Sequence, residues 1–304
     1  MTPDERFIYY IGGWTHPTTI VVPENVKHFG QNELYFYRGP SHTDISGFPY
    51  QYATLTPGFW WGGGQATVGL LDISCLTISA DGINNRGLPA LVKVRVLGDP
   101  LAGILCPLAY IRHWGHIKTV RKCDVAWAPK KNTCVWRGVP TGDQDASNIT
   151  KSTNKRILFC QKYYDLYDVG ITQTWNRWPD SYVKEPMSIA AMLEYKYIIS
   201  IPGNDKDSGI NWKLASNSVV IMAPPEVESW LMEGLLKPYV HYVPLAADYS
   251  DLPHILEWCT THEEDCLRIV AAANEFMSQF NDIEVEKQIF ANIKAHYAKS
   301  FVFV

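Results

Sequence analysis

The chain reads YKYIISIPGNDKDSGINWKLASNSVVIM from Tyr195 to Met222, and this stretch decides the fold. The apolar run at Tyr197–Ile201 has the length and the β-branched content of a buried strand. Turn-forming residues follow it, helical spacing begins at Ser208, and Ser218–Met222 forms a second apolar run. The pattern predicts a strand, a polar loop, a helix and a second strand, the kind of junction at which α/β proteins hold phosphates. No Walker or G-x-G-x-x-G motif accompanies it.

The sequence on either side continues this alternation. A short apolar run at Thr133–Trp136 predicts another strand, and Leu252–Ser300 has helical spacing. Asp251 is expected to cap the first of these terminal helices, and Asn281–Asp282 to separate the last two. We therefore predict an α/β fold with a parallel sheet and helices on both faces. The first third is expected to be rich in strands, starting with Phe7–Ile11.

The length allows more than one domain. A chain of 304 residues can form two domains of ordinary size or one large one. The break at Pro129–Asn132 indicates the boundary between them. We expect an N-terminal domain over residues 1–125, a C-terminal domain over 126–280 and a C-terminal helix over 281–304.

Composition excludes several classes of protein. A hydrophobic content of 46% and an aromatic content of 13% indicate a well-packed globular protein. The net charge of -4 lacks the basic character of a general nucleic-acid-binding protein. No apolar run reaches the ~18 residues that a membrane span needs. The start, Met1–Arg6, lacks a signal-peptide pattern, and seven scattered cysteines without a C-x-x-C pair suggest reduced thiols. We expect a cytoplasmic protein.

A second group of polar residues follows the strand predicted at Thr133–Trp136. Arg137 and Gly138 end the strand, and Thr141 opens a Thr-Gly turn. Arg156 falls in the first turn of the next predicted helix and adds a second charge. Guanidinium groups, bare backbone N–H groups and a hydroxyl are the donors that a diphosphate needs. A hairpin-like turn with surface arginines has the same pattern, so this motif alone leaves both readings open.

The order of these motifs resembles glycosyltransferase family 90. That family includes protein O-glucosyltransferases, fungal capsule xylosyltransferases and bacterial lipopolysaccharide-type sugar transferases. The resemblance is strong over residues 130–276, about half of the chain, and its most specific part is the pair HYVPL and DYSDL. The matching segments are WRGVPTG (136–142), YKY (195–197), the GND loop (203–205), WKLASNSVV (212–220), HYVPL (241–245) and DYSDL (248–252).

The resemblance implies a GT-B-like fold, in which two Rossmann-like domains face a cleft and the C-terminal helices pack back. It implies transfer of glucose or xylose from a UDP-sugar to a hydroxyl of an oligosaccharide or other glycan, with inversion, without a metal and without a further cofactor. The N-terminal domain would hold the acceptor and the C-terminal domain the donor. No nucleic acid is expected as a partner.

By position, the resemblance implies a set of donor-binding residues on both sides of the diphosphate. The implied set is Arg137, Gly138, Thr141, Arg156, Asn204, Asp205, Ser208 and Asn211. Glu233 could accept a hydrogen bond from a ribose or sugar hydroxyl, although a helix glutamate is usually solvated. Many family members carry an arginine near Asn211. Lys213 is either a replacement for that charge or a solvated helix residue.

The general base is harder to assign. An inverting transfer usually needs a carboxylate to deprotonate the acceptor hydroxyl. The family places this aspartate early, in a D-x-P-like context, but the matching stretch Tyr9–Pro17 contains no aspartate. Asp44, in a segment similar to the family's D-I-x-x-P pattern, is the first candidate and His16 the second. Trp61, which precedes three glycines, is either a platform for the acceptor sugar or a core residue.

Asp143–Asp145 fits a D-x-D pattern but lies in a polar loop, so we interpret it as a turn and expect no metal site. The missing D-x-P aspartate leaves open a catalytically inactive module that binds nucleotide-sugars or glycans. A generic Rossmann-like enzyme that uses another nucleotide is a third possibility.

Overall fold

The computed structural model describes most of the C-terminal two thirds of the chain and several short segments before it. The described residues are 1–15, 20–22, 35–37, 60–61, 64–65, 77–79, 91–92, 94–99, 103–105, 116–143, 153–203, 205–299 and 301–303. The chain divides into two compact units. Unit 1 comprises Met1–Arg112, Glu226–Gly234 and Gln279–Val304, and unit 2 comprises His113–Pro225 and Leu235–Ser278.

The units are not continuous in sequence. Residues 226–234 belong to unit 1, whereas the range predicted for the C-terminal domain, 126–280, includes them. The segment predicted as a C-terminal helix, 281–304, also belongs to unit 1 and contains helix α8 (Ile283–Ala298) and strand β15 (Phe301–Phe303). The expected GT-B arrangement of two facing domains stays a prediction.

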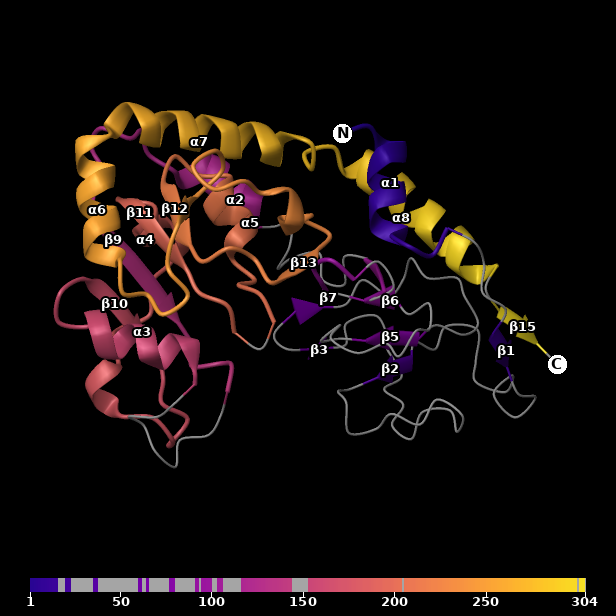
Figure 1. Ribbon diagram of the computed structural model, residues 1–304, viewed down its shortest axis with the longest axis horizontal. Coiled ribbons are helices and arrows are strands. Elements are labelled where there is room, and N and C mark those ends of the chain that lie inside the picture. Colours follow the sequence, from indigo (N-terminus) through magenta and orange to yellow (C-terminus); the bar gives the residue numbers. More distant parts are fainter. Residues whose placement is uncertain are drawn as a thin grey trace. The chain divides into compact units, whose positions relative to one another are not determined.

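Unit 2 is built on a parallel five-stranded sheet (Figure 1). Its strands are β9 (Lys131–Gly138), β10 (Asp168–Ile171), β11 (Tyr195–Ser200), β12 (Val219–Met222) and β14 (Val243–Pro244). The order across the sheet is β10-β9-β11-β12-β14, and Ile198 of β11 pairs with Val135 on one side and Val220 on the other. The chain leaves β9 toward β10 and then returns to build the other side from β11. The sheet therefore has a topological switch point between β9 and β11.

Helices cover both faces of this sheet, as the alternating pattern predicts. They are α2 (His116–Cys123), α3 (Lys155–Tyr163), α4 (Ile189–Met192), α5 (Ile210–Leu214), α6 (Leu252–Thr261) and α7 (Glu263–Ser278). Neighbouring residues of β9 point to opposite faces, since strand side chains alternate. Trp136 joins a core cluster with residues of α3, α6 and α7, while Val135 joins a second cluster with Leu193 and Trp212.

Unit 1 combines helices with short strands. Its described elements include α1 (Pro3–Ile11), β1 (Ile20–Val22), β2 (Tyr35–Tyr37), β3 (Trp60–Trp61), β4 (Gly64–Gln65), β5 (Thr77–Ser79), β6 (Leu91–Val92), β7 (Val94–Val96), β8 (Ile104–Leu105) and β13 (Val227–Ser229). Strands β2, β5, β6 and β8 form a parallel sheet in that order, and β13 pairs antiparallel with β7. Helices α1 and α8, indigo and yellow in Figure 1, pack against each other. Arg6 and Glu286 form a buried ion pair between them.

The prediction of a strand at Phe7–Ile11 is wrong, because these residues end helix α1. The hydroxyl of Thr2 accepts a hydrogen bond from the Glu5 N–H at 3.2 Å, and the Glu5 carboxylate accepts one from the Thr2 N–H at 2.7 Å. This capping box, with Pro3 at the first helical position, starts the helix. A short apolar run alone fits either a strand or a helix, and here the cap that precedes it selects the helix.

The other predicted elements of the C-terminal half agree with the structure. Strands β11 and β12 match the two apolar runs, and Asn281–Asp282 separates α7 from α8. Asp251 lies at the N-cap of α6, but its carboxylate accepts a hydrogen bond from the Ala246 N–H at 2.9 Å instead of capping the helix. Among the described residues, no helix combines the length and the apolar composition required to cross a membrane.

Candidate functional site

The candidate site lies at the carboxyl ends of β9 and β11, on the two sides of the switch point. Parallel α/β sheets bind ligands at this position, because the loops leaving two neighbouring strands diverge there. We call residues 139–143 the β9 loop, and residues 201–203 together with 205–208 the β11 loop. Most of the predicted donor-binding residues fall in or beside these loops.

Asn154 fixes the β9 loop. This buried side chain caps helix α3, since its Oδ1 accepts hydrogen bonds from the N–H groups of Arg156 at 3.0 Å and Ile157 at 3.1 Å. Its Nδ2 donates to the carbonyls of Pro140 at 3.2 Å and Asp143 at 2.7 Å. One amide therefore joins the start of a helix to the loop before it. An asparagine just before a helical segment is visible in the sequence as a cap, but the bonds to the loop are not.

Arg156 joins the two loops to each other. Its Nη1 donates to the Val139 carbonyl of the β9 loop at 2.7 Å. Its Nη2 and Nε donate to Ile201 at 3.1 Å and to Pro202 at 3.3 Å in the β11 loop. The side chain is 8% exposed, so its charge lies within the wall of the site. The guanidinium fork suits this task, because it can donate in several directions at once.

The two loops approach each other closely at Gly203. A Cβ added to this glycine would lie 2.4 Å from Thr141 Oγ1 and 3.1 Å from Arg156 Nη2. Gly142, in the facing loop, has φ 119°, a conformation that favours glycine. The predicted residues Thr141 and Arg156 are thus brought together with the glycine of the GND loop.

A buried ion pair supports the β11 loop. Asp207 pairs with Lys213, accepts a hydrogen bond from Ser200 Oγ at 2.8 Å and accepts another from the Gly209 N–H at 2.8 Å. Lys213 also donates to the Ile199 carbonyl at 2.9 Å. Burial opposes the charged carboxylate, but the positive charges of Lys213 and Arg156 hold the pKa of Asp207 below its usual value. The interpretation of Lys213 as a solvated residue is wrong, since it is 5% exposed.

Arg137 points away from the loops, toward β10. Its guanidinium forms an ion pair with the Asp168 carboxylate and donates to the carbonyls of Asp168 at 2.7 Å and Glu185 at 3.1 Å. Burial opposes ionisation of Asp168, yet hydrogen bonds from Tyr195 and Arg137 lower its pKa. At Gly138, an added Cβ would lie 2.7 Å from the Trp136 ring. At the end of β9, Gly138 therefore packs against the Trp136 ring of the same strand, and Arg137 is held by Asp168 of the neighbouring strand β10.

The remaining donor candidates on the β11 side lie close in sequence to Gly203. The Asp205 carboxylate accepts a hydrogen bond from the Lys206 N–H at 2.6 Å. Ser208 is partly exposed at the end of the loop, and Asn211 is 1% exposed within helix α5. Asn204 lies outside the described residues.

Glu233 belongs to unit 1, whereas the candidates in the two loops belong to unit 2. It begins the 3-10 helix η7 (Glu233–Leu235), and its carboxylate accepts hydrogen bonds from the Ser229 N–H at 2.6 Å and the Ser229 hydroxyl at 3.0 Å. The side chain is 1% exposed. Trp61 lies in strand β3 of the same unit, and Asp44 and His16 lie outside the described residues.

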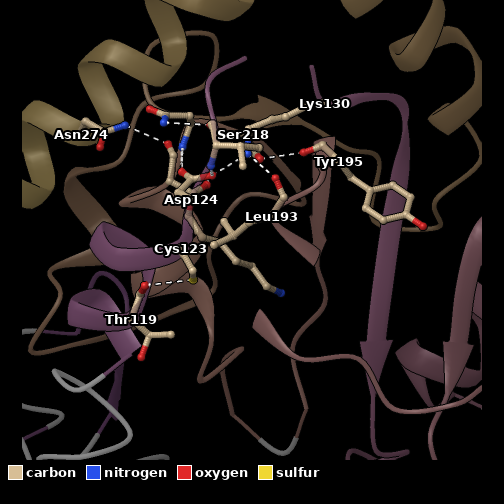
Figure 2. Close-up of polar contacts among 12 residues, drawn as sticks. Thr119, Cys123, Asp124, Lys130, Leu193, Tyr195, Ser218 and Asn274 are labelled. Atoms are coloured by element: carbon tan, nitrogen blue, oxygen red, sulfur yellow. Dashed lines mark hydrogen bonds and ion pairs between the residues drawn. The ribbon is translucent and has the colours of Figure 1, made fainter. Parts of the chain in front are cut away.

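The opposite, amino-terminal edge of the same sheet carries a separate polar network (Figure 2). Lys130 Nζ pairs with Asp124 Oδ1 at 2.6 Å and also donates to the Leu193 carbonyl. Asp124 Oδ2 accepts a hydrogen bond from the Asn217 N–H at 2.6 Å, and Ser218 Oγ donates to the Tyr195 carbonyl at 2.7 Å. These bonds connect the starts of β9, β11 and β12. In the part of the chain that the structure describes, no group of His, Cys, Asp and Glu side chains is arranged to hold a metal.

The strand order defines unit 2 as a doubly wound α/β unit, a class in which ligands bind at the carboxyl edge of the sheet. The family model for glycosyl transferase family 90 matches residues 109–303. The chain belongs to that family.

Several curated proteins are similar to parts of this chain. O-glucosyltransferase LpsA of Dichelobacter nodosus is 33% identical over 202 residues, which cover 66% of this chain and 58% of that protein. Uncharacterized protein 179R of Invertebrate iridescent virus 6 is 28% identical over 210 residues, covering 59% and 18%. Protein O-glucosyltransferase 2 of Danio rerio is 26% identical over 155 residues, covering 49% and 29%. Each match therefore spans less than two thirds of the relative's length.

Proposed function

We propose that the chain is a glycosyltransferase that moves glucose or xylose from a UDP-sugar to a hydroxyl of a glycan acceptor, with inversion and without a metal. The observation that carries the proposal is the pair of loops at the switch point, joined by Arg156, in a chain of glycosyl transferase family 90. The names of the relatives LpsA and protein O-glucosyltransferase 2 favour glucose.

In this proposal the diphosphate of the donor binds between the β9 and β11 loops. Backbone N–H groups of the loops and the Thr141 hydroxyl donate hydrogen bonds to it, with Asn204, Asp205, Ser208 and Asn211 on the β11 side. Arg156 supplies positive charge from within the wall of the site. Negative charge grows on UDP as it leaves, and a fixed cation can stabilise that charge in place of a metal. Arg137 acts as a positioning residue that orders the end of β9 through Asp168.

The transfer is a single displacement. The acceptor oxygen bonds to the anomeric carbon on the face opposite UDP, the bond from that carbon to the diphosphate oxygen breaks, and its electron pair leaves with UDP. The hydroxyl proton passes to a general base. Asp44 is the proposed base, with His16 as the second candidate and Trp61 as the platform for the acceptor sugar.

Substitution of Asp44 tests whether this residue is the general base. Asp44→Asn should lower turnover by about 10²-fold or more, because the acceptor hydroxyl would lose the group that takes its proton. The affinity for UDP should stay at the wild-type value, as Asp44 does not belong to the proposed diphosphate site. Near-normal turnover of the variant would exclude Asp44 and direct attention to His16.

A second candidate function is a catalytically inactive module that binds a nucleotide-sugar or a glycan. The observation that favours it is the absence of an aspartate in Tyr9–Pro17, where family members carry one. Such a module would bind the UDP-sugar and leave its glycosidic bond intact.

A thermal-shift and hydrolysis panel separates these functions. The ligands are UDP-glucose, UDP-xylose, UDP-galactose, GDP-mannose and NAD, each with and without EDTA. Stabilisation by a UDP-sugar with slow release of UDP, unchanged by EDTA, is the result expected of the transferase. Stabilisation without any release supports the inactive module. No response to any UDP compound overturns the proposed donor site, and a strict need for Mn²⁺ overturns the metal-independent mechanism.

A further inference from the structure

The loop that follows β10 holds a tryptophan in a backbone conformation that large side chains rarely adopt. Trp175 and Asn176 both have φ 53°. The Arg177 N–H donates to the Thr174 carbonyl at 3.0 Å and closes a turn around them. Two central residues with positive φ are typical of a type I′ turn, in which glycine and asparagine are the favoured residues. A tryptophan there is an outlier, and such outliers cluster at functional sites.

Both ends of this loop are firmly held. The Thr172 N–H donates to the Gly138 carbonyl at the end of β9, at 2.9 Å, and the Lys184 N–H donates to the Ile171 carbonyl at 2.9 Å. Trp178, three residues after Trp175, is 4% exposed and belongs to the main core cluster. The rest of the loop therefore imposes the turn, and Trp175 is carried at its tip.

The two tryptophans of the loop have opposite environments. Trp178 is buried, whereas Trp175 is 44% exposed. Within the described residues, no hydrogen bond, ion pair or ring contact engages the Trp175 indole. An exposed aromatic ring in a strained turn contributes little to the stability of the folded state. Ligand binding is therefore the role that best explains its position in the loop.

The loop begins at the carboxyl edge of the sheet, beside the β9 loop. Strands β10 and β9 are neighbours, and adjacent strands lie about 4.8 Å apart. The exposed residues Gln173 and Arg177 lie two positions before and after Trp175 in the sequence and carry an amide and a guanidinium group. A flat apolar ring bordered by such hydrogen-bonding groups matches a sugar ring, which has an apolar C–H face and a rim of hydroxyls.

We propose that Trp175 is a stacking platform for a pyranose ring, which makes the loop after β10 a carbohydrate subsite beside the proposed diphosphate site. The inference rests on the proposed function and deepens it. The pyranose belongs either to the donor sugar or to the acceptor glycan, and the chemistry of recognition is the same for both.

Two glycine variants of the full chain test the platform. Trp175→Gly and Asn176→Gly each replace a residue of positive φ by the one that adopts it at no steric cost, so neither should lower the melting temperature. Only Trp175→Gly removes the indole, and it should weaken pyranose binding by about tenfold. Trp175→Phe keeps a smaller ring and should retain part of the affinity. Asn176→Gly is the matched control and should bind as the wild type does.

Titrations with UDP, UDP-glucose and methyl β-D-glucoside in the presence of UDP distinguish the two sources. If Trp175→Gly loses affinity for UDP-glucose and keeps it for UDP, the platform holds the donor sugar. If it keeps both and loses the glucoside, the platform holds the acceptor. If Trp175→Gly binds all three ligands with wild-type affinity, the proposed platform is overturned and the proposed function is unaffected. A wild-type protein that binds the glucoside but no UDP compound overturns the proposed function, and Trp175→Gly then decides the platform by the glucoside alone.

Discussion

The two edges of the unit 2 sheet use buried charge in different ways. At the amino edge, Lys130 and Asp124 satisfy each other and the backbone at the starts of three strands. At the carboxyl edge, Arg156 and the Asp207–Lys213 pair hold the backbone of two loops that have no sheet partner of their own. The amino edge thus stabilises the sheet, while the carboxyl edge uses similar groups to fix the shape of a proposed binding site.

The largest effect is expected from removing the buried lysine of the amino edge. Lys130→Met should lower the free energy of unfolding by about 3–5 kcal/mol, because Asp124, whose side chain is 8% exposed, would keep a buried charge without its partner. Urea unfolding measures this loss. Lys131→Met is the matched control: the Lys131–Glu194 pair is 52% and 56% exposed, and its loss should leave stability nearly unchanged. Equal losses in the two variants would contradict the role given to Lys130.

The two arginines near the end of β9 should differ in their effect on UDP binding. Arg156→Ala should weaken UDP binding by about 1.5–3 kcal/mol, the scale of a lost hydrogen bond to a charged group. Arg137→Ala should weaken it less, because its guanidinium is directed to Asp168. Isothermal titration with UDP gives both values, and the urea midpoint of each variant separates binding from stability. A larger effect at Arg137 would reverse the assignment and place that side chain at the phosphates.

A smaller change at the contact between the two loops should also affect binding. Gly203→Ala would place a Cβ 2.4 Å from Thr141 Oγ1, so the Thr141 side chain or the loops themselves must shift. UDP binding should weaken by about 1–2 kcal/mol, the cost of moderate overpacking. The double variant Gly203→Ala/Thr141→Ala removes the clashing hydroxyl and tests the cause. Coupling between the two substitutions supports the contact, and strict additivity would show that the loops do not meet there.

The smallest expected effect is a pH dependence at Asp207. Its folded-state pKa is lowered below the ordinary value of about 3.9, so its contribution to stability is present above that pH and is lost as the pH falls through the folded-state value. Asp207→Asn should be less stable than the wild type at pH 6 and should lose less stability between pH 5 and pH 3. Urea unfolding across this range measures both slopes. Parallel slopes would show that the ionisation of Asp207 is not linked to folding.

The sequence predicts the sheet of unit 2 well, because its strands are apolar runs bounded by turn formers, as at Tyr197–Ile201. It also indicates the residues that meet at the carboxyl edge, since parallel strands bring their loops to one side. It does not predict the direction of Arg137, which depends on the pairing of β9 with β10. The place of Glu233 depends in the same way on the long-range pairing of β13 with β7. Helix α1 is different, since its capping box of Thr2 and Glu5 is local and can be recognised in the sequence itself.

The ion pair between Arg6 and Glu286 has a consequence for the order of folding. Its partners are 280 positions apart in the chain, and β13 also joins β7 across more than a hundred positions. Unit 1 therefore cannot complete its fold while the ribosome is still making the second half of the protein. Unit 2 can form its sheet once β14 has left the ribosome. Contacts so distant in sequence form slowly, because they require closure of a long loop. Nascent chains that stop after α7 should thus hold a folded unit 2 and an unfinished unit 1.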